Sequence, residues 1–246
     1  MEKEVYIQMR AVEENHWWFV ARRKIIDSAL YELLPNRENR ILDAGCGTGG
    51  NLALLAKHGD VSGIEMDSDA LKFARERNVG RVVQGSFPDS IPKLDCTFDL
   101  ITMLDVLEHV EKDTETLRNL SHMLGDGGCI LVTVPAHPFL WSEHDVRHHH
   151  KRRYTRLELE RVAKEAGLNV KKITYFNMWL FPLVIIVRML KKLIPTSSLQ
   201  DDDAVPSAPI NSLFTFIFSS EAILIKKFKL PIGVSLLAVL LKKSHG

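Results

Sequence analysis

The chain has 246 residues, 46% hydrophobic and 26% charged, a balance that argues against a disordered protein and predicts one main globular domain. The 32 Lys and Arg residues nearly balance the 31 Asp and Glu residues, so the net charge gives no reason to expect a nucleic-acid-binding protein. Its cysteines, Cys46, Cys96 and Cys129, have no metal-ligand spacing, which argues against a disulfide framework and favours a reducing, cytoplasmic compartment.

The first 39 residues predict an N-terminal helical lid without a secretion signal. Residues 15–34 carry apolar side chains at helical spacing and end before Pro35. We expect this helix to lie across the ligand edge of a sheet, with Trp17 and Trp18 over a bound substrate or cofactor. Simple docking of the helix on the core is the alternative.

Residues 40–168 alternate short β-branched runs with helical stretches, which is typical of a doubly wound α/β sheet. Helices are expected at residues 51–58, 68–77, 113–124 and 155–166, with Ser68 and Thr155 as N-caps. Glu158 completes a capping box with Thr155. In such sheets ligands bind beyond the carboxyl ends of the strands, so the residues that follow each strand are the candidates for chemistry.

Residues 178–231 differ in composition and predict an insertion before a final strand at 232–243. Two apolar segments with basic ends flank a loop at 196–209 that we expect to be mobile. The longest uninterrupted apolar run has ten residues, against about 20 for a spanning helix, so no transmembrane helix is expected. The pattern is typical of helices that rest on a membrane surface, but segments that cover the substrate pocket or form a homodimer interface would show it as well.

The stretch ILDAGCGTGGN, residues 41–51, predicts a strand, a glycine turn and the start of a helix. Gly45, Gly47 and Gly50 fit the G-x-G-x-x-G of dinucleotide binders, and Glu65 follows Gly45 by 20 residues, as a ribose-binding acid should. At this point an NAD-dependent oxidoreductase remains open.

The wider order of motifs, however, resembles the class I S-adenosylmethionine-dependent methyltransferases. Asp43-x-Gly45-x-Gly47-x-Gly49 is similar to their first motif, and the resemblance continues through GIEMD, GSFPDSIP, FDLITMLDVLEHV and GDGGCILVTVP. It implies a Rossmann-like seven-stranded mixed sheet with strand order 3-2-1-4-5-7-6 and an antiparallel last strand. The core would comprise residues 40–177 and 232–243.

The resemblance also implies S-adenosyl-L-methionine as cofactor and S-adenosyl-L-homocysteine as product. The glycine loop would hold the methionine part, Glu65 the ribose and Met66 the adenine, while Ser86 stands where the family often has an acid for the adenine amino group. The residues so assigned to the cofactor are Asp43, Gly45, Cys46, Gly47, Gly49, Asn51, Glu65, Met66, Ser86, Phe87 and Leu104.

The segment LDVLEHV, after the fourth predicted strand, resembles the EH segment of ubiquinone-type O-methyltransferases. If it is helical, Asp105, Glu108 and His109 share a face and could bind a divalent cation. A polar helix start without metal is the alternative, and no metal site is predicted.

The stretch SEHDVRHHHKRRYT, residues 142–155, follows the fifth predicted strand at the same edge. His144 and His150 match a pattern of a methyltransferase subgroup, and with His109 they are the candidate catalytic bases. A zinc site is disfavoured because adjacent histidines point in different directions. The predicted substrate contacts are Arg152, Arg153 and Tyr154, with Trp17 and Trp18; a solvated basic turn is the alternative.

These patterns predict a methyltransferase that transfers a methyl group in line to the oxygen of a small or lipid-like acceptor, with a histidine base. An NAD-dependent oxidoreductase and an inactive cofactor-binding scaffold are the alternative functions. We expect a cytoplasmic protein that could also contact a membrane surface. Its oligomeric state is left open between a monomer and a homodimer.

Overall fold

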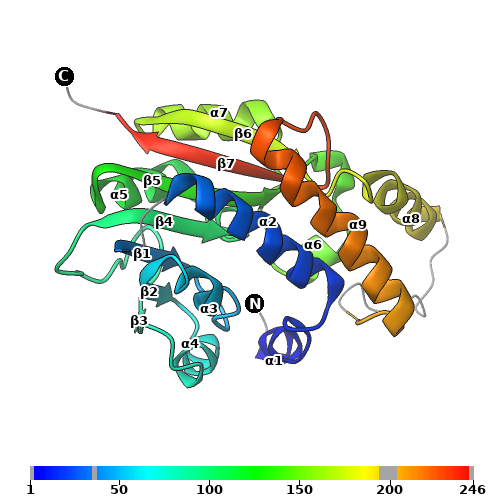
Figure 1. Cartoon of the computed structure of the whole chain (residues 1–246), viewed down its shortest axis with the longest axis horizontal. Coiled ribbons are helices and arrows are strands. Elements are labelled where there is room, and N and C mark those ends of the chain that lie inside the picture. Colours follow the sequence, from blue (N-terminus) through cyan, green and yellow to red (C-terminus); the bar gives the residue numbers. More distant parts are fainter. Residues whose placement is uncertain (1–2, 35–37, 194–203, 244–246) are drawn as a thin grey trace.

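Seven strands pair into one mixed sheet in the order β3-β2-β1-β4-β5-β7-β6 in the computed structural model, which describes residues 3–34, 38–193 and 204–243 (Figure 1). The strands are β1 (Asn39–Ala44), β2 (Gly59–Glu65), β3 (Arg81–Gln84), β4 (Phe98–Leu104), β5 (Leu124–Pro135), β6 (Leu168–Phe176) and β7 (Ser235–Lys242). Strand β7 is antiparallel to both of its neighbours. The predicted fold class and strand order are therefore confirmed.

The central strands are apolar on both faces because helices cover both faces. Successive residues of a strand point to opposite sides, so Ile41 and Leu42 of β1 belong to two different hydrophobic clusters. Leu100 and Ile101 of β4 are divided in the same way. This double burial fixes the register of the central strands, and hence the positions of the residues at their carboxyl ends.

The helices match the predicted alternation, with differences at their ends (Figure 1). They are α1 (Lys3–Val12), α2 (Trp17–Leu33), α3 (Leu52–Leu55), α4 (Ser68–Glu76), α5 (Asp113–His122), α6 (Glu143–Arg147), α7 (Arg156–Glu165), α8 (Phe181–Leu193) and α9 (Ala208–Lys227). Two 3₁₀ turns, η1 (Leu107–His109) and η2 (Pro138–Leu140), complete the described elements.

Local capping explains two of these ends. The predicted box of Thr155 and Glu158 caps α7. The predicted cap Ser68 was wrong, because the side chain of Asp67 accepts the free N–H groups of Asp69 (2.9 Å) and Ala70 (3.0 Å) instead. The helix predicted at residues 51–58 is only the single turn of α3.

Two helices, not one, precede the sheet. Helix α2 packs beside α9, where Ser28 Oγ donates to the Ala222 carbonyl oxygen at 2.7 Å. The Trp17 ring lies 5.5 Å from the ring of Phe214 and 6.0 Å from that of Phe218. Most of α2 therefore covers one face of the sheet rather than its ligand edge, and Trp17 is a docking residue of this packing.

The described part of the insertion between β6 and β7 consists of α8 and α9. Residues 194–203 lie outside the described residues, and they include most of the loop that is predicted to be mobile. By length and composition alone α9 is long and apolar enough to cross a membrane, and few of its residues are buried. The sequence prediction of no transmembrane helix rested on the length of uninterrupted apolar runs. Ser and Thr residues interrupt the apolar sequence of α9, so that criterion missed this helix.

Candidate active site

The glycine loop after β1 is shaped by its contacts with neighbouring strands. The N–H groups of Gly45 and Cys46 donate to the Ile64 carbonyl oxygen at 2.8 and 3.0 Å, which turns the loop over β2. Gly45 has a φ of +82°, and a Cβ there would lie 2.7 Å from the Val106 side chain. A side chain at this position would be strained and would clash, so the loop needs glycine to expose its backbone.

Glu65 closes the loop from the end of β2. Its Oε2 accepts the Gly47 N–H at 2.8 Å and its Oε1 accepts the Asp67 N–H at 2.9 Å. Burial raises the pKa of this carboxyl above its usual value. Met66, next along the chain, is exposed. The structure thus brings Glu65 and the glycine loop together, as the cofactor assignment requires.

Asp43 and Cys46 are both buried beside this loop. Thr102 Oγ1 donates to Asp43 Oδ1 at 2.7 Å, and burial raises the pKa of Asp43 to about 6. The second oxygen, Oδ2, has no hydrogen-bond partner among the described residues. Burial also raises the pKa of the Cys46 thiol, so this cysteine is a small packing group rather than a nucleophile.

The remaining predicted cofactor residues lie at the same edge of the sheet. Ser86 follows β3 and exchanges backbone hydrogen bonds with Ser90, at 2.9 and 3.0 Å. Phe87 packs against a hydrophobic cluster, and Leu104 is the buried last residue of β4. Asn51 precedes α3 without a capping bond from its side chain. These positions agree with the assignment but do not test it.

Helix α1 covers the cofactor side, and this contact was missed from the sequence. Tyr6 is buried, and burial, followed by the charges of Glu65 and Asp67, raises the pKa of its hydroxyl. Glu13 Oε2 accepts the Thr48 hydroxyl at 2.7 Å, and Arg77 contacts Glu13. The buried end of α1 is therefore joined directly to the glycine loop.

This junction explains one glycine of the dinucleotide-type pattern. A Cβ on Gly50 would lie 2.2 Å from Glu13 Oε2. Arg77 holds the other side of the junction, with its Nε donating to the Thr48 carbonyl oxygen at 2.8 Å. Gly50 makes room for the carboxylate of Glu13, the residue after α1, so its match to G-x-G-x-x-G says nothing about a nicotinamide cofactor.

Arg22 of α2 is a second site residue that the sequence reasoning missed. Its buried guanidinium lies 2.6 Å from Asp105 Oδ2, donates to Thr133 Oγ1 at 3.1 Å and stands 5.0 Å from the Trp18 ring centroid. Arg22 Nε has no hydrogen-bond partner among the described residues. A charged residue one turn before the buried Ile25 was the available signal, because such a charge needs a partner at the sheet edge.

The predicted trio of Asp105, Glu108 and His109 does not share a helix face. Asp105 has a φ of +57° and pairs with Arg22, and residues 107–109 form the 3₁₀ turn η1. His150 takes the place of Asp105: ligand atoms of Glu108, His109 and His150 lie within 4.8 Å of one another. The acceptor side therefore joins two stretches about forty residues apart.

Glu108 is fully buried at this junction. Neither of its carboxylate oxygens has a hydrogen-bond partner among the described residues. Burial, followed by the charge of Asp105, raises the pKa of Glu108 well above its usual value. Burial also lowers the pKa of His109 to about 3, so this imidazole is neutral near neutral pH.

His150 is held by a buried acid. Its Nδ1 lies 2.9 Å from Asp145 Oδ1, which also accepts Arg153 Nε at 2.7 Å, and Ser142 N donates to Asp145 Oδ2 at 2.9 Å. Burial alone would raise the pKa of Asp145, but His150 and Arg153 lower it below its usual range. The ionised Asp145 therefore fixes the imidazole of His150 through one ring nitrogen.

The other candidate histidines lie around this pair. The His109 ring centroid is 4.7 Å from that of His150, in an edge-on arrangement. The His144 ring centroid lies 4.2 Å from that of His148, with the two rings tilted by 33°, and 6.2 Å from that of His150. All three predicted bases are thus close together, and His150 is joined to the buried carboxylate of Asp145.

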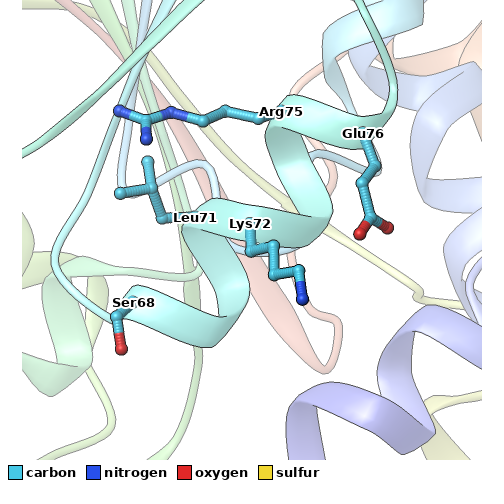
Figure 2. A pocket seen from close by; sticks show the side chains of 5 residues that line it. All are labelled: Ser68, Leu71, Lys72, Arg75 and Glu76. Carbon is cyan, nitrogen blue, oxygen red and sulfur yellow. The ribbon is translucent and has the colours of Figure 1, made fainter.

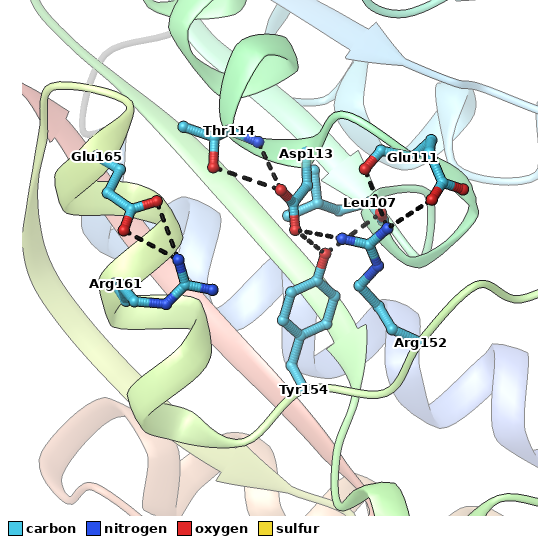
Figure 3. A network of polar contacts seen from close by, with 8 residues as sticks. All are labelled: Leu107, Glu111, Asp113, Thr114, Arg152, Tyr154, Arg161 and Glu165. Atoms are coloured by element: carbon cyan, nitrogen blue, oxygen red, sulfur yellow. Dashed lines mark hydrogen bonds and ion pairs between the residues drawn. The ribbon is translucent and has the colours of Figure 1, made fainter.

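The predicted substrate residues of the following turn have partners within the protein (Figure 3). Asp113 Oδ2 accepts the buried Tyr154 hydroxyl at 2.8 Å and Arg152 Nη1 at 3.0 Å. Arg153 is buried between Asp145 and the Ala136 carbonyl oxygen. Arg152 and Arg153 therefore attach the loop to α5 and to the residue that follows β5. That they also contact a substrate stays a prediction.

An open depression on α4 is not the site (Figure 2). Its lining residues, Ser68, Leu71, Lys72, Arg75 and Glu76, all come from one helix. Arg75 there donates to the Val82 carbonyl oxygen at 3.0 Å. The depression lacks both the glycine loop and the acceptor-side histidines.

Comparisons with known proteins agree with this architecture. Residues 18–173 match the family described as methyltransferase domain. The chain is 27% identical to the ubiquinone biosynthesis O-methyltransferase of Aeromonas salmonicida, over 55% of this chain and 65% of that protein. It is 32% identical to the phosphoethanolamine N-methyltransferase of Triticum aestivum, over 42% of this chain but only 21% of that protein.

A solved structure with the same fold is that of the complex between the Haloferax volcanii Trm112 methyltransferase activator and its methyltransferase. The match has a TM-score of 0.64 and 17% identity, and covers 99% of this chain and 96% of that one. The family match spans the glycine loop, Glu65 at the end of β2 and the acceptor-side loop. The chain therefore belongs to the class I S-adenosylmethionine-dependent methyltransferases.

Proposed function

We propose that this chain transfers the methyl group of S-adenosylmethionine to the oxygen of a small or lipid-like acceptor, with His150 as the general base. The observation that carries the acceptor chemistry is the His150–Asp145 pair at the carboxyl edge of the sheet. The name of the A. salmonicida relative, an O-methyltransferase of ubiquinone biosynthesis, supports oxygen as the acceptor atom.

The cofactor side fits the methyl donor in three ways. Gly47 leaves open space where a side chain would stand, so a ligand can approach its backbone, and Glu65 offers a carboxylate that can accept two ribose hydroxyls. The guanidinium of Arg22 can pair with the carboxylate of the methionine part. The bound donor supplies an electrophilic methyl carbon on sulfur.

The acceptor side supplies alignment and proton transfer. Asp145 binds Nδ1 of His150 and so leaves Nε2 to take the proton of an acceptor hydroxyl. The acceptor oxygen then bonds to the methyl carbon as the carbon–sulfur bond breaks, and sulfur keeps the electron pair. The neutral His109 beside it can accept a hydrogen bond from the acceptor without repelling His150 once that ring is protonated.

A lipid-like acceptor suits the exposed apolar helices α8 and α9 of the insertion, which we propose to meet a membrane surface. The enzyme would then be cytoplasmic and peripheral to the membrane. A water-soluble acceptor reached through the same edge is the alternative, and it would leave these helices without a role in substrate capture.

A divalent cation is a second candidate for the acceptor side. The two unpartnered oxygens of Glu108, close to His109 and His150, favour it, because a buried carboxylate without a partner is costly. In that case His150 would be a ligand and not the base. Activity that survives chelation of divalent ions supports the base, and loss restored by added Mg²⁺ or Zn²⁺ supports the cation.

The proposal is tested with methyl-labelled S-adenosylmethionine and two fractions of a cell extract, one lipid and one water-soluble, followed by mass spectrometry. We expect label in an oxygen methyl ether of the lipid fraction, and its loss with His150→Ala. Label on nitrogen or carbon would contradict the oxygen assignment. No label in either fraction, despite tight binding of S-adenosylhomocysteine, would favour the inactive scaffold.

A further inference from the structure

Helix α8 has its polarity reversed relative to an ordinary surface helix. Leu183, Ile186, Val187 and Leu190 follow the i, i+3, i+4, i+7 spacing of one helix face, and all four are exposed. Such a stripe faces the core in a soluble protein. Here it faces away from the described core.

The inward side of α8 carries the contacts that fix it. The Phe181 ring packs 5.2 Å from the ring of His137. Two turns later, Arg188 bonds to the Leu140 carbonyl oxygen and lies 3.8 Å from Asp145 Oδ2. The polar and aromatic contacts thus point to the acceptor-side loop, and the aliphatic stripe is left outside.

Helix α9 also has exposed apolar residues on one face. Leu213, Phe216, Ser220, Ile223 and Lys227 are spaced three or four residues apart, so they form one outer stripe. Its aromatic member, Phe216, is 74% exposed. Exposed apolar side chains gathered on one helix face in this way are typical of an interaction site.

The opposite side of α9 is bonded to the rest of the molecule, which decides between lying on a membrane and crossing it. Glu221 is fully buried and its Oε1 accepts the N–H groups of Met178 (2.7 Å) and Trp179 (2.9 Å). Asn211 accepts the Trp17 N–H at 2.8 Å. A spanning position would break these bonds and carry the Glu221 carboxyl into hydrocarbon, so these contacts argue against a spanning helix.

The charges beside the outer stripe of α9 indicate what kind of surface it would bind. Lys226, Lys227 and Lys229 are exposed at the end of α9, and Phe228 between them is exposed as well. Between residues 204 and 232 the one acid is the buried Glu221. Apolar side chains bordered by cations match an anionic bilayer, whose headgroups attract lysine while the stripe enters the acyl boundary.

We infer that the outer stripes of α8 and α9 dock this enzyme on an anionic phospholipid surface, without spanning it. The inference rests on the proposed lipid-like acceptor and deepens it, because Arg188 and Phe181 place the docked helix next to the acceptor-side loop. A lipid-like acceptor in that bilayer would be near His150 without leaving the membrane surface.

The test is cosedimentation of the full chain with phosphatidylcholine vesicles that do or do not contain phosphatidylglycerol. We expect binding to the anionic vesicles, release by high salt, and binding at least about tenfold weaker to pure phosphatidylcholine. Phe216→Asp and Ile186→Asp should each weaken binding to anionic vesicles at least about tenfold. The matched control is Leu157→Asp, because Leu157 of α7 is equally apolar and 76% exposed, but lies outside the insertion.

Three outcomes would overturn the inference: no sedimentation of the wild-type chain with anionic vesicles, unchanged binding in both stripe variants, or equal loss in the Leu157→Asp control. A fourth is a stable dimer that Phe216→Asp dissociates, without any vesicle binding. S-adenosylhomocysteine affinity is measured on every variant. It should stay at the wild-type value, so a failure of membrane docking is separable from a failure of the methyltransferase proposal.

Discussion

The cofactor side and the acceptor side occupy the same edge of one sheet but are built differently. On the cofactor side, Glu65 binds Gly47, a residue 18 positions away, and Asp67 beside it. On the acceptor side, His150 depends on Asp145 and Arg153 and meets Glu108 and His109 from another strand end. The donor side is built on one glycine loop that the neighbouring strand end closes, and the acceptor side is built from contacts between loops.

The two sides differ because one binds a cofactor of fixed shape and the other binds the acceptor. A fixed cofactor needs a fixed backbone cradle, whereas acceptors differ in size and shape between enzymes of one fold. The acceptor-side charges are also mutually dependent, since Asp145 joins a histidine and an arginine in a buried group. We therefore expect changes on the acceptor side to lower methyl transfer or stability while leaving cofactor affinity intact.

The largest effect is expected from His150→Ala. Removal of the base should lower methyl transfer by about 10²- to 10⁴-fold, measured as label transferred from S-adenosylmethionine in single turnover. Affinity for S-adenosylhomocysteine should stay within about twofold, because His150 contacts Asp145 and the rings of the other acceptor-side histidines. A loss of cofactor affinity as large as the loss of rate would erase the distinction between the two sides.

Asp145→Asn should come next. The substitution leaves the buried Arg153 guanidinium without its anionic partner, which typically costs about 3–5 kcal/mol of unfolding free energy. Urea unfolding measures this loss. The control is Glu143→Gln, an exposed acid in the same short helix, which should change the unfolding free energy by less than about 0.5 kcal/mol. Equal stability of the two variants would contradict the role given to Asp145.

His109 makes stability depend on pH. Its folded pKa of about 3 lies below the ordinary 6.5, so the unfolded chain gains a proton first as the pH falls. Its contribution is constant above about pH 6.5 and declines between there and about pH 3, by about 2 kcal/mol at pH 5. His109→Asn should remove that part of the acid sensitivity in urea unfolding. An unchanged pH profile would place this ring in solvent.

The smallest effect concerns the junction of α1 with the glycine loop. Glu13→Gln weakens a buried charge-assisted bond to Thr48 and Arg77, so S-adenosylhomocysteine should dissociate about tenfold faster. Stopped-flow tryptophan fluorescence measures that rate. Glu14→Gln is the control, since Glu14 also binds Arg77 but is exposed, and it should change the rate less than about twofold. The same rate in both variants would show that α1 does not retain the cofactor.

The sequence predicted the parts of the site that a motif order implies and missed the contacts that join side chains to one another. The strand order and the place of Glu65 in the cofactor site were accessible, because the resemblance in motif order implies them. Arg22 and Glu13 were not, because their partners lie in other elements, and the pairing of His150 with Asp145, five residues earlier, was not, because nothing in the stretch indicates that the two side chains meet. The basic pair was interpreted as substrate-binding, and only the structure shows Asp113 and Asp145 as its partners.

Calorimetric titration of the chain with S-adenosylhomocysteine and with NADH tests most directly the claim that the glycine loop and Glu65 form a methyl-donor site. The wild-type chain and His150→Ala should bind S-adenosylhomocysteine alike and leave NADH unbound. Glu65→Ala should bind S-adenosylhomocysteine at least about tenfold more weakly, since the ribose loses its acceptor. Binding of NADH, or full S-adenosylhomocysteine affinity in Glu65→Ala, would contradict the claim.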